Sequence, residues 1–334
     1  MAAMPDSTVT VFLAADDGFS RPLAVTIRSI VAHLTPGRAL DLHLCDMGMS
    51  PRSRALIEQV AEHPDVRLRW IDDLQEKVAD LPQSWTHISS ATYARLFIPA
   101  MLPDSVTKAL YLDCDLVVRR CIGDLFDVPM EQFAAMAVAN AGSPYVSSPL
   151  GLPYWSRFGR RADEVNYNAG VLLMNLAAWR DGDVTGAALN YLAKEHLFQG
   201  DQAAVNAVLP GRVGTLDPRW NQQTGHFSQV LQAALSYPEE QLAQLLAEPW
   251  VVHFTTHVKP WNYGSTHPFR GEWFARLDET PYRGWRPSRW AYYVDQSRRV
   301  LREAKRRLLP GAEVLPGSKV AEVLPGSKVT ASEV

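Results

Sequence analysis

The feature that most constrains the fold of this chain is an alternation of short apolar runs with segments of helical periodicity. Residues 8–15, 41–45 and 66–71 have the length and composition of strands, and the first run is apolar enough to be buried on both faces. Residues 22–34 carry apolar side chains at helical spacing, and residues 51–62 predict a second helix. The alternation indicates a parallel sheet with helices on both faces.

The same alternation continues along the chain. Ligands of such sheets bind beyond the carboxyl ends of the strands, so Asp16, Asp17 and the residues that follow the other strands are the first candidates for a site. A polar loop over 141–159 is a candidate lid or acceptor surface. The later predicted elements are strands at 108–112, 134–140, 170–176 and 250–254, and helices at 184–196 and 201–208.

Composition excludes several classes of protein. The chain has 334 residues, of which 47% are hydrophobic and 21% charged, so a packed core is expected rather than a disordered or fibrous chain. A net charge of −3 gives no general attraction to nucleic acid. Three cysteines without a CxxC pair predict neither a disulfide framework nor a zinc knuckle. With no secretory signal and no apolar run long enough to span a membrane, a soluble intracellular enzyme is expected.

Paired aspartates are the first sign of chemistry. The sequence has no dinucleotide-binding glycine motif and no P-loop, so a phosphate ligand would need another cation. Asp113 and Asp115 follow the apolar strand end at 110–112 and stand two residues apart. In an extended segment such residues point the same way, so both carboxylates can reach one hard cation. The alternative is a solvated acidic turn after a strand.

Further motifs accompany this pair in a fixed order. Together they resemble the retaining glycosyltransferases of family 8, which include glycogenin and the bacterial lipopolysaccharide galactosyltransferases. The resemblance extends over residues 9–261 and is strongest to the bacterial galactosyltransferase branch. The motifs are AADD at 14–17, HISSATYARL at 87–96, DCD at 113–115, NYNAGVLLMNL at 166–176, FQGDQAAVN at 198–206 and HFTTHVKPW at 253–261.

The resemblance implies a GT-A fold of the α/β class, with a mostly parallel Rossmann-like sheet flanked by helices, and a UDP-sugar donor. It also implies Mn²⁺, with Mg²⁺ as an alternative, bound by Asp113, Asp115 and His253. Two carboxylates and an imidazole suit such a cation. Lys259 would neutralise the diphosphate as it leaves. For His253 alone, the alternative is a histidine at the edge of the core.

The resemblance also implies donor-site residues. For three of them another interpretation stays open: a surface salt bridge for Arg95, a turn for Asn168, and a packed thiol for Cys114, which strand alternation points away from the aspartates. The implied donor-site residues are Ala14, Asp16, His87, Ile88, Arg95 and Cys114, with Asn140 and Asn168 facing the donor sugar.

The chain departs from the family pattern at three positions. Gly18 stands where the family commonly has Asn, so one hydrogen bond to the nucleotide is in question. Asn140 stands where galactosyl-transferring relatives tend to have Asp, which leaves the donor hexose open. Thr256 replaces a glycine that lets the backbone approach the diphosphate.

The residues nearest the chemistry are Asp201 and Gln202. Retention by double displacement needs a carboxylate nucleophile beside the anomeric carbon. The family pattern places Gln202 there, and an amide is a poor nucleophile, so same-face attack by the acceptor is expected. Gln202 would orient groups or stabilise positive charge on the sugar, and Asp201 would hold sugar hydroxyls or Arg95. Asp201 is also a candidate helix N-cap.

The predicted function is that of a metal-dependent retaining glycosyltransferase, which moves glucose or galactose from a UDP-sugar to a hydroxyl of a glycan or glycolipid. The alternative is a nucleotide-sugar-binding scaffold that hydrolyses its ligand slowly or not at all. Residues 1–280 are assigned to the catalytic domain. No nucleic-acid partner is expected.

The C-terminal sequence has a different character. Residues 283–309 carry nine basic and two acidic side chains, a net charge of +7, with Trp285, Trp290, Tyr292 and Tyr293 interleaved. Such residues settle on anionic membrane surfaces, so 281–310 is predicted to form a helical extension on the inner face of the cell membrane. The alternative is a basic helix packed by its aromatic residues on the catalytic domain. Residues 311–334 contain EVLPGSKV twice and predict a flexible tail.

Overall fold

The computed structural model describes residues 8–72, 74–78, 90–195, 200–235, 237–290 and 293. The chain divides into two units after Arg286, so the second unit contributes only 287–290 and 293 to the described residues. Of the predicted C-terminal extension, only residues 281–290 and 293 are described, and the predicted tail at 311–334 lies outside the described residues. The elements discussed below belong to the first unit.

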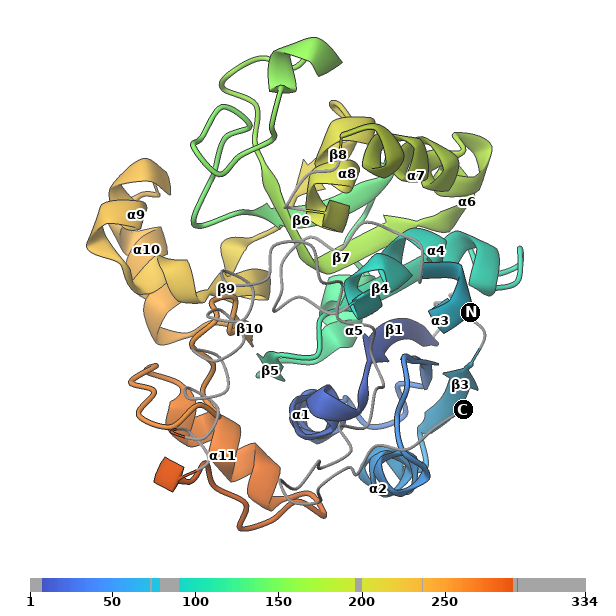
Figure 1. The fold of residues 1–334 in the computed structure, drawn as a ribbon, viewed down its shortest axis with the longest axis vertical. Coiled ribbons are helices and arrows are strands. Elements are labelled where there is room, and N and C mark those ends of the chain that lie inside the picture. The colour runs from blue at the N-terminus through green and yellow to red at the C-terminus, as the bar shows by residue number, and fades with distance from the viewer. Residues whose placement is uncertain are drawn as a thin grey trace, which may run out of the picture. The chain divides into compact units, whose positions relative to one another are not determined.

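A seven-stranded sheet forms the centre of this unit, with the strand order β3-β2-β1-β4-β7-β6-β8 (Figure 1). Neighbouring strands are parallel except at β7, which runs antiparallel to both β4 and β6. The strands are β1 (Val9–Ala15), β2 (Leu40–Asp46), β3 (Val66–Ile71), β4 (Lys108–Leu112), β6 (Ala135–Ala139), β7 (Tyr167–Asn175) and β8 (Val213–Thr215).

Helices cover both faces of this sheet because its central strands are apolar on both sides. In β1, Val11 and Leu13 pack on one face and Phe12 and Ala14 on the other. One face is covered by α1, α2 and α5, and the other by α3, α4, α6, α7 and α8. Their bounds are α1 (Ser20–Ala32), α2 (Pro51–Ala61), α3 (Leu74–Val78), α4 (Ala94–Met101), α5 (Ile122–Phe126), α6 (Leu176–Asp181), α7 (Val184–Glu195) and α8 (Gly200–Val208).

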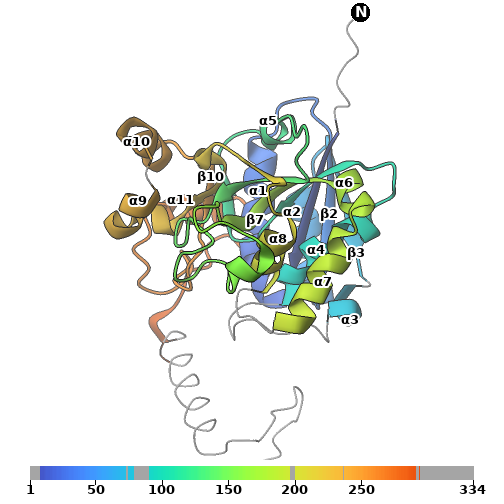
Figure 2. The same ribbon diagram turned by 90° about the horizontal axis from the view of Figure 1, so that it is seen from above.

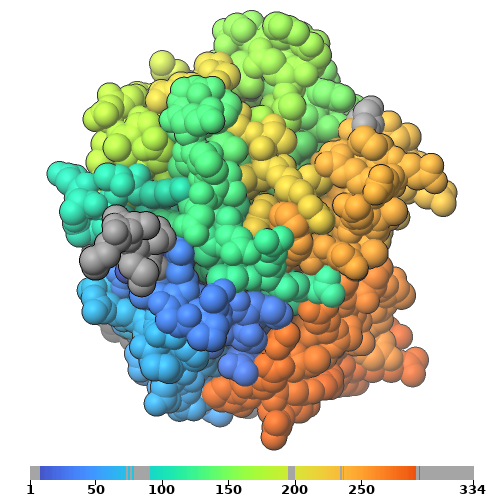
Figure 3. Space-filling view, turned by 180° about the vertical axis from the view of Figure 1, so that it is seen from behind, coloured from blue at the N-terminus to red at the C-terminus, as the bar shows by residue number. Residues whose placement is uncertain are grey.

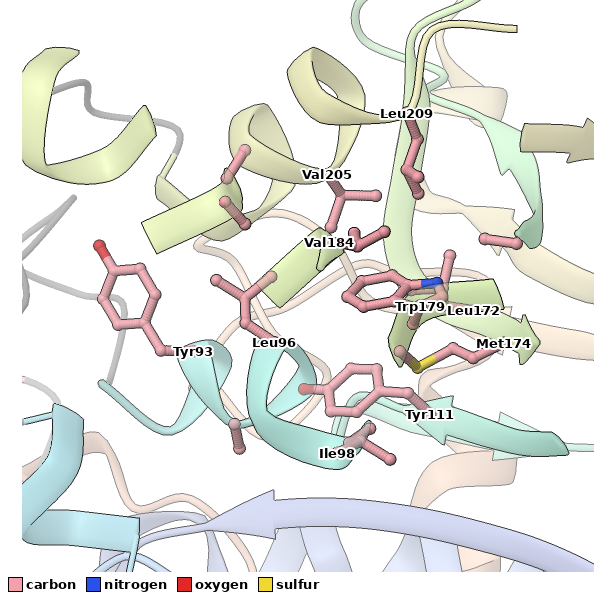
Figure 4. Close-up of a cluster of buried hydrophobic side chains, with 14 of the residues drawn as sticks. Tyr93, Leu96, Ile98, Tyr111, Leu172, Met174, Trp179, Val184, Val205 and Leu209 are labelled. Atoms are coloured by element: carbon pink, nitrogen blue, oxygen red, sulfur yellow. The ribbon is translucent and has the colours of Figure 1, made fainter. Parts of the chain in front are cut away.

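The core on the second of these faces is dense. Trp179 of α6 lies between Val184 and Met174 (Figure 4) and is almost completely buried. Its indole nitrogen donates a hydrogen bond of 3.0 Å to the carbonyl of Ala134, so the polar end of the ring is satisfied inside the core. Residues of α4, α6, α7 and α8 belong to the same buried cluster as residues of the strands that carry the site.

A second, three-stranded sheet extends the molecule in the order β5-β10-β9. Its strands are β5 (Leu116–Val118), β9 (Gln222–Gln223) and β10 (Val251–His253). The helices α9 (Gln229–Leu235), α10 (Glu239–Ala247) and α11 (Arg270–Asp278) gather at the same end of the molecule (Figure 2). Trp273 and Leu277 of α11 pack on Val25 of α1, which places late residues beside the N-terminal half (Figure 3).

The predicted fold class is confirmed. The predicted strands at 66–71 and 108–112 have the observed bounds, and α2 and α8 differ from prediction by one residue. The exception to a parallel sheet is β7, which follows β6 through a loop rather than a crossover helix and therefore pairs antiparallel. Periodicity did not predict the three-residue strands β5 and β8, or α4, which contains Pro99.

Among the described residues, every helix is too short or too polar to cross a bilayer.

Candidate active site

A cavity of about 500 Å³ opens where β1 and β4 end. Because β7 is antiparallel to β4, its first residues lie at that same edge, so Asn168 and Gly170 face the residues that follow β4. All predicted site residues that the structure describes line this cavity, and His87 and Ile88 lie outside the described residues. The predicted residues brought together are Ala14, Asp16, Arg95, Asp113, Cys114, Asp115, Asn140, Asn168, Asp201, Gln202, His253 and Lys259.

Two carboxylates and an imidazole form a cluster at the cavity. The Nε2 atom of His253 lies 3.2 Å from Oδ1 of Asp115 and 3.5 Å from Oδ2 of Asp113. One potential ligand atom from each residue falls within 4.8 Å of the others. The small sheet makes this possible, because β5 begins directly after Asp115 and pairs Leu116 with His253 on β10.

Gly170 leaves the space that this cluster needs. An ideal Cβ at position 170 would lie closer than 3.0 Å to both His253 and Asp113. The backbone cannot easily retreat, since the carbonyl of Gly170 accepts a hydrogen bond of 2.8 Å from the amide of Asp113. The donor set and the space around it therefore fit a divalent cation that accepts oxygen and imidazole ligands.

Arg95 connects the cluster to α8. It is buried, with its Nη2 2.9 Å from Asp113 and its Nε 2.7 Å from Asp201, and its guanidinium stacks on Tyr111. Burial lowers the pKa of Arg95, but the two carboxylates raise it above its ordinary value overall. The alternative of a surface salt bridge is therefore wrong. Burial raises the pKa of Asp201, an effect that Arg95 opposes.

Asp201 is not the residue that caps α8. The helix begins at Gly200, so Asp201 lies in its first turn and points to Arg95. The sequence predicted that Asp201 holds sugar hydroxyls or Arg95, and in the structure it contacts Arg95. Gln202 follows and accepts a hydrogen bond of 3.1 Å from the side-chain amide of Asn168. Asn168 is the second residue of β7 and is buried, so a turn at this position is excluded.

Lys259 also reaches the cluster. Its ammonium group lies 2.6 Å from Oδ2 of Asp115 and donates to the carbonyl of Phe254. Burial raises the pKa of Asp115, but Lys259 and His253 together hold it well below its ordinary value. Asp115 is thus kept ionised, the form in which a carboxylate binds a metal.

The remaining predicted residues form the walls of the cavity. Asp16 caps a short 3₁₀ turn by accepting a hydrogen bond of 3.2 Å from the amide of Phe19. Asn140 accepts one of 3.0 Å from the amide of Gly142. Cys114 touches the cavity, but its thiol is buried and donates to the carbonyl of Ala14. Burial raises the pKa of this thiol, as expected for a packed cysteine.

Besides Gly170, sequence reasoning missed Tyr111, Asn221 and Gln223. The Tyr111 hydroxyl donates a hydrogen bond of 2.8 Å to Asp113. Strand alternation could have found it, because residues two apart in β4 and its extension share a face. Asn221 contacts His253 at 2.9 Å, and Gln223 accepts a hydrogen bond of 2.9 Å from the amide of Ala141. No spacing or motif in the sequence points to these two.

The chain is similar to several known proteins. The family described as glycosyl transferase family 8 matches residues 10–265. General stress protein A of Bacillus subtilis is 25% identical over 283 residues, which cover 83% of this chain and 96% of that protein. Glycosyltransferase GlyD of Streptococcus pneumoniae is 30% identical over 284 residues, which cover 80% of this chain and 30% of GlyD.

Among solved structures, the galactosyltransferase LgtC in complex with donor and acceptor sugar analogs has a TM-score of 0.68. It is 24% identical to this chain, and the similar region covers 85% of this chain and 99% of that one. This similarity confirms the GT-A fold class.

Proposed function

Because this chain belongs to glycosyl transferase family 8, it is a glycosyltransferase, and we propose that it moves glucose or galactose from a UDP-sugar to a hydroxyl of a glycan or glycolipid. We propose Mn²⁺, with Mg²⁺ as the alternative, as the cation held by Asp113, Asp115 and His253. The transfer would retain the configuration at the anomeric carbon.

The observation that carries this proposal is the Asp-Asp-His cluster at the edge of the cavity. When bound there, a divalent cation would stabilise the negative charge of a departing diphosphate. LgtC, which shares the fold, was solved with donor and acceptor sugar analogs. The cavity volume of about 500 Å³ is in the range of small-molecule sites.

The surrounding side chains would prepare the site for an anionic donor. Lys259 lies at the cluster with its ammonium group on Asp115, so it supplies a second positive charge for the diphosphate. Arg95 and Tyr111 both contact Oδ1 of Asp113 and leave its Oδ2 facing His253. Asp113 is thereby oriented before any ligand binds.

Same-face attack is the mechanism that these contacts support. The acceptor oxygen would bond to the anomeric carbon as the bond from that carbon to the diphosphate breaks, and the acceptor proton would pass to an oxygen of the leaving phosphate. Double displacement would need a free carboxylate nucleophile. Asp201 is engaged by Arg95 at 2.7 Å, and Gln202 offers only an amide.

The test is release of UDP from UDP-glucose and UDP-galactose with Mn²⁺, measured with and without a crude glycolipid acceptor. A glycosyltransferase releases UDP faster with the acceptor, and the product keeps the anomeric configuration of the donor. Slow release that the acceptor does not change would favour the nucleotide-sugar-binding scaffold. A glycosyl adduct on Asp201, trapped by mass spectrometry, would contradict same-face attack.

We also propose that the basic C-terminal segment at 281–310 attaches the protein to the inner face of the cell membrane. Of its described aromatic residues, Trp290 and Tyr293 are 79% and 51% exposed. Trp285 does not share this role, because it is partly buried against the apolar cluster that contains Trp273 of α11. The guanidinium of Arg21 stacks 4.6 Å from its ring centroid. Trp290 and Tyr293 are therefore the described aromatic residues that we propose contact the membrane.

The membrane proposal is tested by truncation after Arg286, which keeps Trp285 in the first unit. Full-length protein should co-sediment with phosphatidylglycerol vesicles at low salt and be released at high salt, since each basic residue contributes about 1 kcal/mol at an anionic surface. The truncated protein should stay in solution and still bind UDP-sugar. Equal vesicle binding by both proteins would refute the proposal.

A further inference from the structure

A continuous chain of side-chain hydrogen bonds runs from the Asp-Asp-His cluster to Gln202. His253 Nδ1 lies 2.9 Å from Oδ1 of Asn221, and Nδ2 of Asn221 lies 2.9 Å from Oδ1 of Asn168. Asn168 Nδ2 in turn lies 3.1 Å from Oε1 of Gln202. Asn221 is completely buried, with 0% of its surface exposed.

Two backbone amides fix the direction of this chain. The amide of Gly170 donates to Oδ1 of Asn168 at 3.0 Å, and the amide of Ala169 donates to Oε1 of Gln202 at 3.3 Å. A backbone N–H can only donate, so the atoms that it contacts must be oxygens and not amide nitrogens. The orientation of both side-chain amides follows from these contacts.

These orientations also determine which nitrogen of His253 carries the proton. Because Oδ1 of Asn168 is an acceptor, Asn221 must donate to it through its NH₂ group and must turn its own oxygen to His253. The Nδ1 atom of His253 therefore carries the proton and donates to Asn221. In a neutral imidazole this leaves a lone pair on Nε2, the atom that faces Asp113 and Asp115.

We propose that Asn221 is a positioning residue that holds His253 in the tautomer able to bind a metal through Nε2, and that it ties this ligand to Gln202 through Asn168. The inference rests on the proposed metal-dependent function. The second sheet supplies the geometry, because Asn221 comes directly before β9, which pairs in parallel with β10 and aligns Gln223 with His253.

Two substitutions separate the two hydrogen bonds of Asn221. Asn221→Ala removes both the acceptor for His253 and the donor for Asn168. Asn221→Asp has nearly the same shape and keeps an acceptor for His253, but it has no hydrogen to donate to Asn168. Asn206→Ala is the matched control, since Asn206 is as buried and donates to the carbonyls of Tyr167 and Gln202, with no contact to His253.

The first measurement is the affinity for Mn²⁺ in the presence of UDP, followed by the electron paramagnetic resonance signal of free Mn²⁺. Loss of a hydrogen bond to a metal-bound histidine weakens binding by about 10–100-fold, and Asn221→Ala should do so. Asn221→Asp should bind Mn²⁺ as tightly as the parent or more tightly. It should nevertheless lose turnover, because the hydrogen bonds that connect Gln202 to His253 are interrupted between positions 221 and 168. Asn206→Ala should keep the parental Mn²⁺ affinity.

The second measurement reads the tautomer in metal-free protein. Long-range proton–nitrogen spectra of histidine-labelled protein, with His253 assigned by comparison with His253→Gln, should report a proton on Nδ1 in the parent and in Asn221→Asp. Asn221→Ala should lose this preference. A thermal melt of each variant establishes that it is folded.

Three results would overturn the inference. They are a proton on Nε2 of His253 in the parent, parental Mn²⁺ affinity in folded Asn221→Ala, and loss of affinity in Asn221→Asp equal to that in Asn221→Ala. If Asn221→Ala does not fold, Asn221→Asp and the parental spectrum decide. If the parent binds no Mn²⁺, the proposed metal dependence fails, whereas the tautomer spectrum still decides the role of Asn221.

Discussion

Replacing Gly170 by alanine tests whether the Asp-Asp-His cluster works as a unit. The new Cβ would overlap Cε1 of His253 so strongly that the ring must move by more than 1 Å to reach the ordinary contact distance of 3.4 Å. Oδ2 of Asp113 would be displaced as well. The backbone of Gly170 is held on both sides, because its amide donates to Asn168 and its carbonyl accepts from the amide of Asp113. The side chains of His253 and Asp113 must therefore move.

The magnitude follows from this displacement. Overpacking of a filled site costs about 1–3 kcal/mol, so Gly170→Ala should fold with its melting temperature lowered by a few degrees. A misplacement of about 1 Å in a catalytic group costs about 10²-fold in rate. We therefore expect turnover to fall by about 10²-fold and Mn²⁺ affinity by about 10-fold or more, on the scale known for disturbed metal ligands.

The assay is UDP release and Mn²⁺ titration on the same protein preparations, with a thermal melt of each. Gly271→Ala is the matched control, because a Cβ at that position on α11 meets no atom within 4 Å. This control should keep the parental metal affinity and turnover, and it should be at least as stable as the parent, because alanine favours a helix more than glycine does. Parental Mn²⁺ affinity and turnover in Gly170→Ala would refute the argument that this glycine makes room for the cluster.

Three further predictions concern single side chains. Asp115→Ala should abolish Mn²⁺-dependent UDP-sugar binding while the fold survives, and a parental turnover rate would contradict its role as a ligand. Arg95→Met leaves two carboxylates without their buried partner and should lower the free energy of unfolding in urea by about 3–5 kcal/mol, whereas Arg161→Met, at an exposed ion pair, should leave it nearly unchanged. Burial lowers the pKa of His226 to about 4, so the neutral ring stabilises the fold above its unfolded pKa of about 6.5. Stability should fall by about 3 kcal/mol as the pH drops from about 6.5 to about 4, because in this range the unfolded chain binds a proton that the folded chain does not, and by less in His226→Asn.

The sequence alone determined the layers of the fold and the edge at which the site lies. In β1 every residue is buried, and a run that is apolar except for Thr10 predicts a strand covered on both faces. Asp113 and Asp115 follow such a strand, and the rule that ligands bind beyond strand ends predicted the edge of the sheet at which the cavity opens. These are local signals, because burial pattern and strand polarity can be read from neighbouring residues.

The family resemblance named His253 and Asn168, but only the tertiary structure shows how these residues reach the aspartates. His253 reaches the aspartates because β10 pairs with β5. The sequence predicted a strand around β10, but β5 has three residues, too few to show a pattern. Asn168 and Gly170 reach them because β7 runs antiparallel, an outcome of the loop that precedes it. Asn221 contacts His253 from another part of the sequence without any motif. Periodicity describes the environment of one segment, whereas hydrogen bonds between distant segments depend on strand pairing and register, which no single segment encodes.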